Sequence, residues 1–259
     1  MANLQEDLSR IGKQLMFSEP FYGIFMSTLN KVARKDVPTA GVSKNNINYQ
    51  LAINEEFWDS LDNDKKKIGL LKHELLHICF NHLEDREWYP NHELHNIAAD
   101  LEINQYLTPE YYPTPDIILL TSFPELNLPT FAGTKVYYEL LQQALDKGTS
   151  PSLQRLMDAL TGDESGGLHP TWKEFDGMSE ADAKLAKAQI EHQIKGIVNE
   201  HKNQGRGFVP AELQSWIDSM FEERAPAYDW KAYFRRFFSS SSKIYTKKTR
   251  RKLNKRFFE

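Results

Sequence analysis

A short stretch in the first third of the chain, His73-Glu74-Leu75-Leu76-His77, restricts the fold more than any other feature. Residues four positions apart lie one above the other on a helix, so the two imidazoles can reach one tetrahedral metal ion. The neighbouring positions Leu70, Leu71 and Ile78 are apolar, which predicts that this helix is buried. Two histidines and a glutamate inside a core carry a desolvation cost unless a metal or another partner compensates it. The motif therefore predicts a zinc site on a buried helix.

Glu74 lies beside the two histidines and is not expected to bind the ion itself. From this position its carboxylate can take a proton from a zinc-bound water, whose pKa the ion lowers to roughly 7, and pass that proton to a leaving amine. The pattern predicts a zinc-dependent peptidase with Glu74 as the general base. Short motifs also arise by chance, so the alternative is a helix that carries the same residues but binds no zinc. The apolar surroundings of the motif argue against this alternative.

The motif supplies only two ligands, whereas a catalytic zinc ion usually has three from the protein and one water. His82 follows His77 by five residues, which on a continuous helix places it nearly on the opposite side, so we expect a structural role for it. The third histidine of the metzincin pattern is missing, because Leu83 occupies that position. The third ligand is therefore expected from the next helix.

That next predicted helix offers two polar faces. Asn96, Asp100 and Asn104 form one stripe at helical spacing, and His95 and Glu102 share a different face. The stripe can also be read as a helix face that contacts solvent or loops. Spacing alone leaves Asp100, Glu102 and His95 open as the third ligand.

The rest of the chain predicts an α+β fold that is mainly helical and zincin-like. Residues 47–54 alternate between apolar and polar, which is the period of a half-buried strand and indicates a small sheet ahead of the motif helix. The motif helix is expected to begin after Leu61-Asp62-Asn63-Asp64, where three side chains can cap it, and to continue to Asp85 before Pro90 stops it. Further helices are predicted over the first thirty residues with an interruption at Pro20, and over residues 92–107, 134–145, 179–205 and 211–223.

These elements suggest four parts along the chain. Residues 1–148 form the zincin-like core, 149–177 a mobile connection rich in Gly, Ser and Pro, 178–230 a helical region, and 231–259 a basic tail rich in aromatic residues. The tail holds eleven Lys and Arg against the single acid Glu259, although the whole chain has a net charge of -4. An acidic body argues against a protein that coats nucleic acid, and we interpret the tail as a linker to another domain. No nucleic-acid partner is expected.

The single cysteine, Cys79, excludes an intrachain disulfide and a four-cysteine zinc site. The N-terminal residues lack the apolar core of a signal peptide, and no run of about 18 apolar residues could span a bilayer. We therefore expect a soluble cytoplasmic protein without a membrane contact.

The HELLH sequence, followed by NIAADLEIN at residues 96–104, resembles a family of zinc metallopeptidase domains from bacteria and their phages. Domains of this family commonly precede a von Willebrand factor A-like domain. The resemblance extends over residues 37–42, 47–58, 207–217 and 229–238. It implies that zinc is bound by His73, His77 and Asp100, with Glu74 as the base.

The resemblance also suggests partners. It implies a protein or peptide substrate and a von Willebrand factor A-like or AAA+ ATPase partner, in the cytoplasm of a bacterial cell or a phage-infected host. Because the chain stops after its basic tail, we expect the A-like domain to be absent, truncated or supplied separately. Peptidase activity in the family is itself assigned by motif, so the alternative is a catalytically silent, zinc-stabilised interaction module in an ATPase-linked or phage assembly.

A second motif, His169-Pro-Thr-Trp172, resembles an element of the same family. It could bring His169 over the site as an oxyanion donor, but we favour a loop histidine with an anchoring tryptophan. Asn96, Asn104 and His169 are thus further candidates, for hydrogen bonds to the metal ligands or for contact with substrate.

Overall fold

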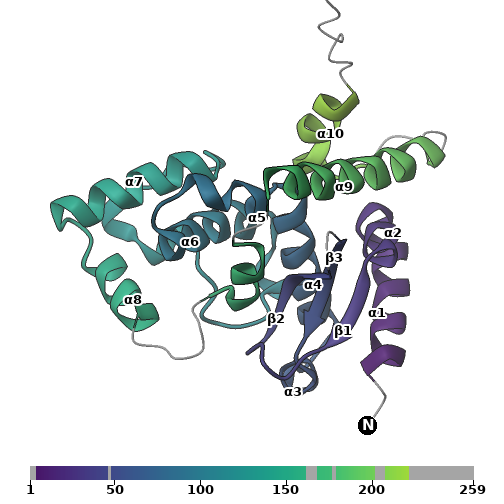
Figure 1. The fold of residues 1–259 in the computed structure, drawn as a ribbon. Helices are drawn as coiled ribbons and strands as arrows, with labels where there is room; N and C mark the ends of the chain where they lie inside the picture. Colours follow the sequence, from purple (N-terminus) through teal and green to yellow (C-terminus); the bar gives the residue numbers. More distant parts are fainter. Residues whose placement is uncertain (1–3, 46–47, 162–167, 177–178, 202–207, 222–259) are drawn as a thin grey trace, which may run out of the picture. The chain divides into compact units, whose positions relative to one another are not determined.

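The computed structural model describes residues 4–45, 48–161, 168–176, 179–201 and 208–221 (Figure 1). The chain divides into two compact units, Met1–Ser219 and Met220–Glu259, and the first contains the sheet and almost all of the described helices. The basic tail predicted at residues 231–259 lies outside the described residues. The division of the chain into four functional parts stays a prediction.

A three-stranded sheet lies at the N-terminal end of the chain, with strand order β1-β3-β2. The central strand β3 (Asn48–Ile53) pairs antiparallel with β2 (Ala40–Asn45) and parallel with β1 (Asn30–Ala33). The alternation in residues 47–54 predicts β3 correctly, whereas the four-residue strand β1 has no such pattern and was not predicted. Because β2 is an edge strand, its outer backbone N–H groups need partners from elsewhere.

The N-terminal helices cover the motif helix. Helices α1 (Leu4–Ser18) and α2 (Pro20–Thr28) both pack against α4 (Asp64–Cys79), which also contacts β2. Asn63 caps α4, as expected, because its side chain accepts a hydrogen bond from the Lys66 N–H at 3.0 Å. The short helices α3 (Glu55–Ser60), α5 (His82–Asp85) and η1 (Arg86–Trp88) complete this part.

A second layer is built on α6 (His92–Ile103), which packs against α7 (Thr134–Lys147) and α8 (Pro151–Thr161). Leu94, Ile97 and Leu101 on α6 are fully buried in this contact. The remaining helical elements are η2 (Asn104–Tyr106), η3 (Pro109–Tyr111), η4 (Leu120–Ser122), η5 (Pro124–Leu126), η6 (Pro170–Phe175), α9 (Glu180–Glu200), η8 (Ala211–Leu213) and α10 (Gln214–Phe221). The fold is α+β and mainly helical, as the sequence predicts.

Two local expectations differ from the structure. The motif helix ends at Cys79 and not at Asp85, because Asn81 adopts a left-handed conformation with φ 58° that no helix can continue through. Within the predicted mobile connection, residues 149–177, the structure has helix α8 and the turn η6. Helix α8 can begin there because the Ser150 hydroxyl accepts a hydrogen bond from the Leu153 N–H. In the described part of the chain, no helix has the length and apolar character needed to cross a membrane.

Candidate metal centre

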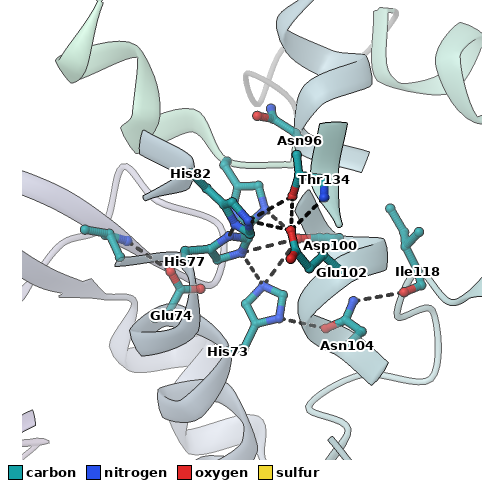
Figure 2. A network of polar contacts seen from close by, with 12 residues as sticks. His73, Glu74, His77, His82, Asn96, Asp100, Glu102, Asn104, Ile118 and Thr134 are labelled. Carbon is teal, nitrogen blue, oxygen red and sulfur yellow. Dashed lines mark hydrogen bonds and ion pairs between the residues drawn. The ribbon is translucent and has the colours of Figure 1, made fainter. Parts of the chain in front are cut away.

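Four buried side chains from three parts of the chain converge on one point. His73 and His77 come from α4, Asp100 from α6, and His169 from the residue before η6. One ligand atom from each lies within 4.8 Å of every other. Figure 2 shows His73 and His77 directed toward Asp100. The structure thus brings a carboxylate and three imidazoles together where the sequence predicts two histidines and one further ligand.

Two of the distances between these atoms match a tetrahedral ion, and two are shorter. Asp100 Oδ1 lies 3.6 Å from His73 Nε2, 3.3 Å from His77 Nε2 and 2.9 Å from His169 Nε2. The two α4 nitrogens are 3.1 Å apart. Zinc bonds of about 2.0–2.2 Å would place neighbouring ligand atoms about 3.3–3.6 Å apart. The donor types and spacing therefore fit a small divalent cation such as zinc.

His73 is held in the tautomer that can bind such an ion. Its Nδ1 lies 2.9 Å from Asn104 Oδ1, and Asn104 Nδ2 donates to the carbonyl oxygen of Ile118 at 2.9 Å. With the amide oriented by Ile118, Asn104 Oδ1 can only accept, so Nδ1 of His73 carries the proton. The Nε2 lone pair of His73 then faces Asp100. Asn104 is therefore a residue that hydrogen-bonds a candidate ligand.

His77 has a different partner, which its spacing in the sequence does not suggest. Its Nδ1 lies 2.9 Å from Nδ1 of His82. The helix turns at Asn81, so His82 returns toward His77 and does not lie on the far side of a continuous helix. His82 does not belong to the group of candidate ligands, and its structural role stays a prediction. Burial lowers the pKa of His77 well below its ordinary value and outweighs the contact with Asp100, which raises it, so the imidazole is neutral.

Glu74 is fixed beside the cluster by the sheet. Its Oε2 accepts a hydrogen bond of 3.0 Å from the backbone N–H of Val42 on the free edge of β2. Burial raises the pKa of the Glu74 carboxyl, and the charges of His73 and His169 oppose this only in part. A buried carboxyl with a raised pKa can both accept and return a proton near neutral pH.

His169 reaches the cluster because its ring stacks on Trp172. The two rings are 4.3 Å apart at an angle of 13°, and both residues are buried. Burial by itself would lower the pKa of His169, but the carboxylate of Asp100 raises it above the ordinary value. Burial would likewise raise the pKa of Asp100, but the charges of His169 and His73 hold it well below the usual range. Asp100 is therefore ionised, and either protons or a cation must balance its charge.

The other residues considered on α6 lie outside the cluster. Asn96 accepts a hydrogen bond of 3.0 Å from Arg86 and donates one of 3.4 Å to Glu93. Glu102 accepts hydrogen bonds from Thr134 on α7. His95 is stacked on Tyr89, and burial lowers its pKa to about 2. Of the three α6 residues that spacing left open, only Asp100 is brought to the motif histidines.

His169 was not predicted to be a metal ligand. The spacing from His169 to Trp172 suggested that His169 could lie over the site, although a loop histidine was favoured, and it did not indicate that the ring would reach Asp100, 69 positions away. That contact depends on η6 packing against β2, which is a tertiary effect.

Fold and site together define a class: an α+β protein in which an HExxH helix meets a carboxylate of the following helix to form a buried candidate metal site. A family model described as "Putative metallopeptidase domain" matches residues 5–258, and the chain belongs to this family. The family resemblance drawn from the motifs is thereby confirmed. No curated protein and no solved structure matches the chain.

Proposed function

We propose that this protein is a zinc-dependent peptidase with its active site at His73, His77 and Asp100. The observation that carries the proposal is the convergence of these three ligand atoms at tetrahedral spacing, with the Glu74 carboxyl held beside them. Membership of a metallopeptidase family supports the same reaction class. Zinc fits the nitrogen and oxygen donors, although other divalent ions accept similar ligands.

When bound, a zinc ion would polarise the scissile carbonyl and acidify a water molecule. The protein's own residues supply the rest. The Val42 N–H orients Glu74, which takes the proton of the attacking water and returns it to the leaving amine. Asn104 and Ile118 hold the ring of His73, and burial keeps His77 neutral. The products are a new carboxylate and a free amine.

Glu74→Gln tests this role. The amide can still accept from Val42 and has almost the same volume, but it cannot act as a base. We expect the variant to retain zinc, measured by inductively coupled plasma mass spectrometry, and to lose peptide hydrolysis about 10²–10⁴-fold. Hydrolysis would be followed by mass spectrometry on a peptide library. The exposed Glu139→Gln on α7 is the matched control. Unchanged hydrolysis in Glu74→Gln would contradict the proposal.

A second function is favoured by one observation, the position of His169. His169 is the fourth member of the group of candidate ligands, with its Nε2 at 2.9 Å from Asp100 Oδ1, and a zinc ion with four protein ligands is typical of structural sites. In that case the protein is a catalytically silent, zinc-stabilised module in an ATPase-linked or phage assembly. A von Willebrand factor A-like or AAA+ ATPase partner, and the cytoplasm of a bacterial cell or phage-infected host, belong to both proposals.

A further inference from the structure

We infer that His82, Thr134 and Glu102 form a hydrogen-bonded chain that selects the metal-binding tautomer of His77. These three are positioning residues, because none of them lies among the candidate ligand atoms. The inference rests on the proposed metal site and does not depend on peptide hydrolysis.

The chain begins at His77 on α4 and continues through residues of α5, α6 and α7. Nδ1 of His77 lies 2.9 Å from Nδ1 of His82, whose Nε2 lies 2.9 Å from the Thr134 hydroxyl and 3.3 Å from Glu102 Oε2. The Thr134 hydroxyl also donates to Glu102 Oε2, and so does the Thr134 backbone N–H, at 2.8 Å. Figure 2 shows this path from His77 through His82 to Thr134 and Glu102.

The donors and acceptors along the chain fix where each proton lies. Oε2 of Glu102 accepts from both the backbone N–H and the hydroxyl of Thr134, and this uses the single hydroxyl proton of Thr134. Nε2 of His82 faces these two oxygens, so it must donate. A neutral imidazole has one N–H, which leaves Nδ1 of His82 as an acceptor for the Nδ1–H of His77. The Nε2 of His77 then carries a lone pair toward Asp100, as metal binding requires.

The reverse arrangement would block the site. If His82 donated from Nδ1, His77 would carry its proton on Nε2, directed at Asp100 Oδ1 only 3.3 Å away. The contacts of Thr134 oppose this order, because its hydroxyl proton goes to Glu102 Oε2 and its hydroxyl oxygen then needs a donor from Nε2 of His82.

Local backbone geometry builds the chain. The left-handed Asn81 returns His82 to His77, and Gly133, at φ 88°, directs the first N–H of α7 to Glu102. Glycine is suited to this φ because it has no Cβ. The two motif histidines thus differ in their hydrogen-bond partners. Nδ1 of His73 contacts the neutral amide of Asn104, whereas Nδ1 of His77 contacts His82, which in turn contacts the carboxylate of Glu102. A carboxylate partner increases the basicity of a ligand histidine, so the histidine binds a metal ion more strongly.

The test measures zinc affinity and the protonated nitrogen separately, on the full chain. Glu102→Gln and Thr134→Val should each weaken zinc binding about 10–100-fold in competition with a fluorescent chelator, whereas Thr134→Ser, which keeps the hydroxyl, should bind like the wild type. The control is Glu139→Gln on the exposed face of α7. Circular dichroism checks that the variants are folded.

Side-chain ¹H–¹⁵N correlation spectra of the zinc-free protein give a readout that a merely structural role would not move. We expect His77 protonated at Nδ1 and His82 at Nε2 in the wild type, with His77 shifting toward Nε2 protonation in Glu102→Gln. A His82 protonated on both nitrogens, or a Glu102→Gln protein with wild-type affinity and tautomers, would overturn the inference. If the wild type binds no zinc, the metal site fails, but the spectra still decide whether the chain sets the tautomer.

Discussion

At the scale of single residues, the site depends on one oxygen atom. Asp100 Oδ1 faces three imidazole nitrogens, and its side chain is only 9% exposed. Without a metal, a protonated His169 balances the charge of Asp100, because that pair has the shortest distance in the cluster, 2.9 Å. A bound cation would take over this role. The two candidate functions therefore assign different roles to His169.

His169→Ala separates these functions. If three ligands suffice, the variant should hold zinc within about tenfold of the wild-type affinity and hydrolyse peptides at least as fast, because a fourth position is then open to water. Zinc content and peptide hydrolysis are the two measurements. His192→Ala, an exposed histidine on α9, is the control. Complete loss of zinc would instead support a closed structural site.

At the scale of elements, Asp7 joins α1 to its neighbours. Its carboxylate accepts hydrogen bonds from Lys67 on α4 at 2.7 Å, Trp58 on α3 at 2.9 Å and Arg10 at 2.9 Å. Burial alone would raise its pKa, but these three donors lower it to about 2. A carboxyl whose pKa is lowered on folding adds stability above its unfolded pKa, and this stability is lost as the pH falls toward 2.

Asp7→Asn should therefore lower the free energy of unfolding by about 2 kcal/mol at pH 7. The difference from the wild type should shrink below pH 4 and disappear near pH 2. Urea unfolding at several pH values measures it, with the exposed Asp59→Asn on α3 as the control. A loss of stability that is constant from pH 7 to pH 2 would mean that the ionised carboxylate is not the cause.

Gly69 allows α4 to approach η3 closely. A Cβ at this position would overlap the carbonyl oxygen of Tyr111, and the position lies one turn before His73. Gly196 in α9 is the opposite case, because an added Cβ meets nothing within 4 Å there. Helix propensity favours alanine at both positions by up to about 1 kcal/mol, so packing decides the sign at Gly69.

We expect Gly69→Ala to lower the free energy of unfolding by about 1–3 kcal/mol and Gly196→Ala to raise it by about 0.5–1 kcal/mol. Denaturant midpoints of the two variants measure the contrast. Equal stabilisation by both substitutions would show that α4 can move away from Tyr111 without cost.

Local signals account for what could be predicted at this scale. Asn63 caps α4 as expected, because a cap is read from a few adjacent residues. The choice among the α6 candidates was not available from spacing, because it depends on how α6 is rotated against α4. The prediction placed His82 on the far side of a continuous helix. This was wrong because one left-handed residue, Asn81, reverses the chain direction before His82. Such turns have weak sequence signals.

At the scale of the described body of the molecule, the candidate site acts as a cross-link. It joins α4, α6 and the residue before η6: Asp100 follows His77 by 23 positions, and His169 follows Asp100 by 69. These atoms come together only in the folded chain, so an ion that binds them stabilises the fold by mass action. The effect depends on the free ion concentration relative to its dissociation constant.

Zinc at about a thousand times its dissociation constant should add about 4 kcal/mol to the stability of the fold. For a chain of this size that corresponds to a rise in Tm of about 8–16 °C, measured by calorimetry with zinc and with a chelator. His77→Ala should abolish the difference, because it removes a ligand atom from the centre of the cluster, whereas Glu74→Gln should keep it. A wild-type Tm that is the same with zinc and with chelator would show that protons, through His169 and Asp100, are enough to hold the cluster together.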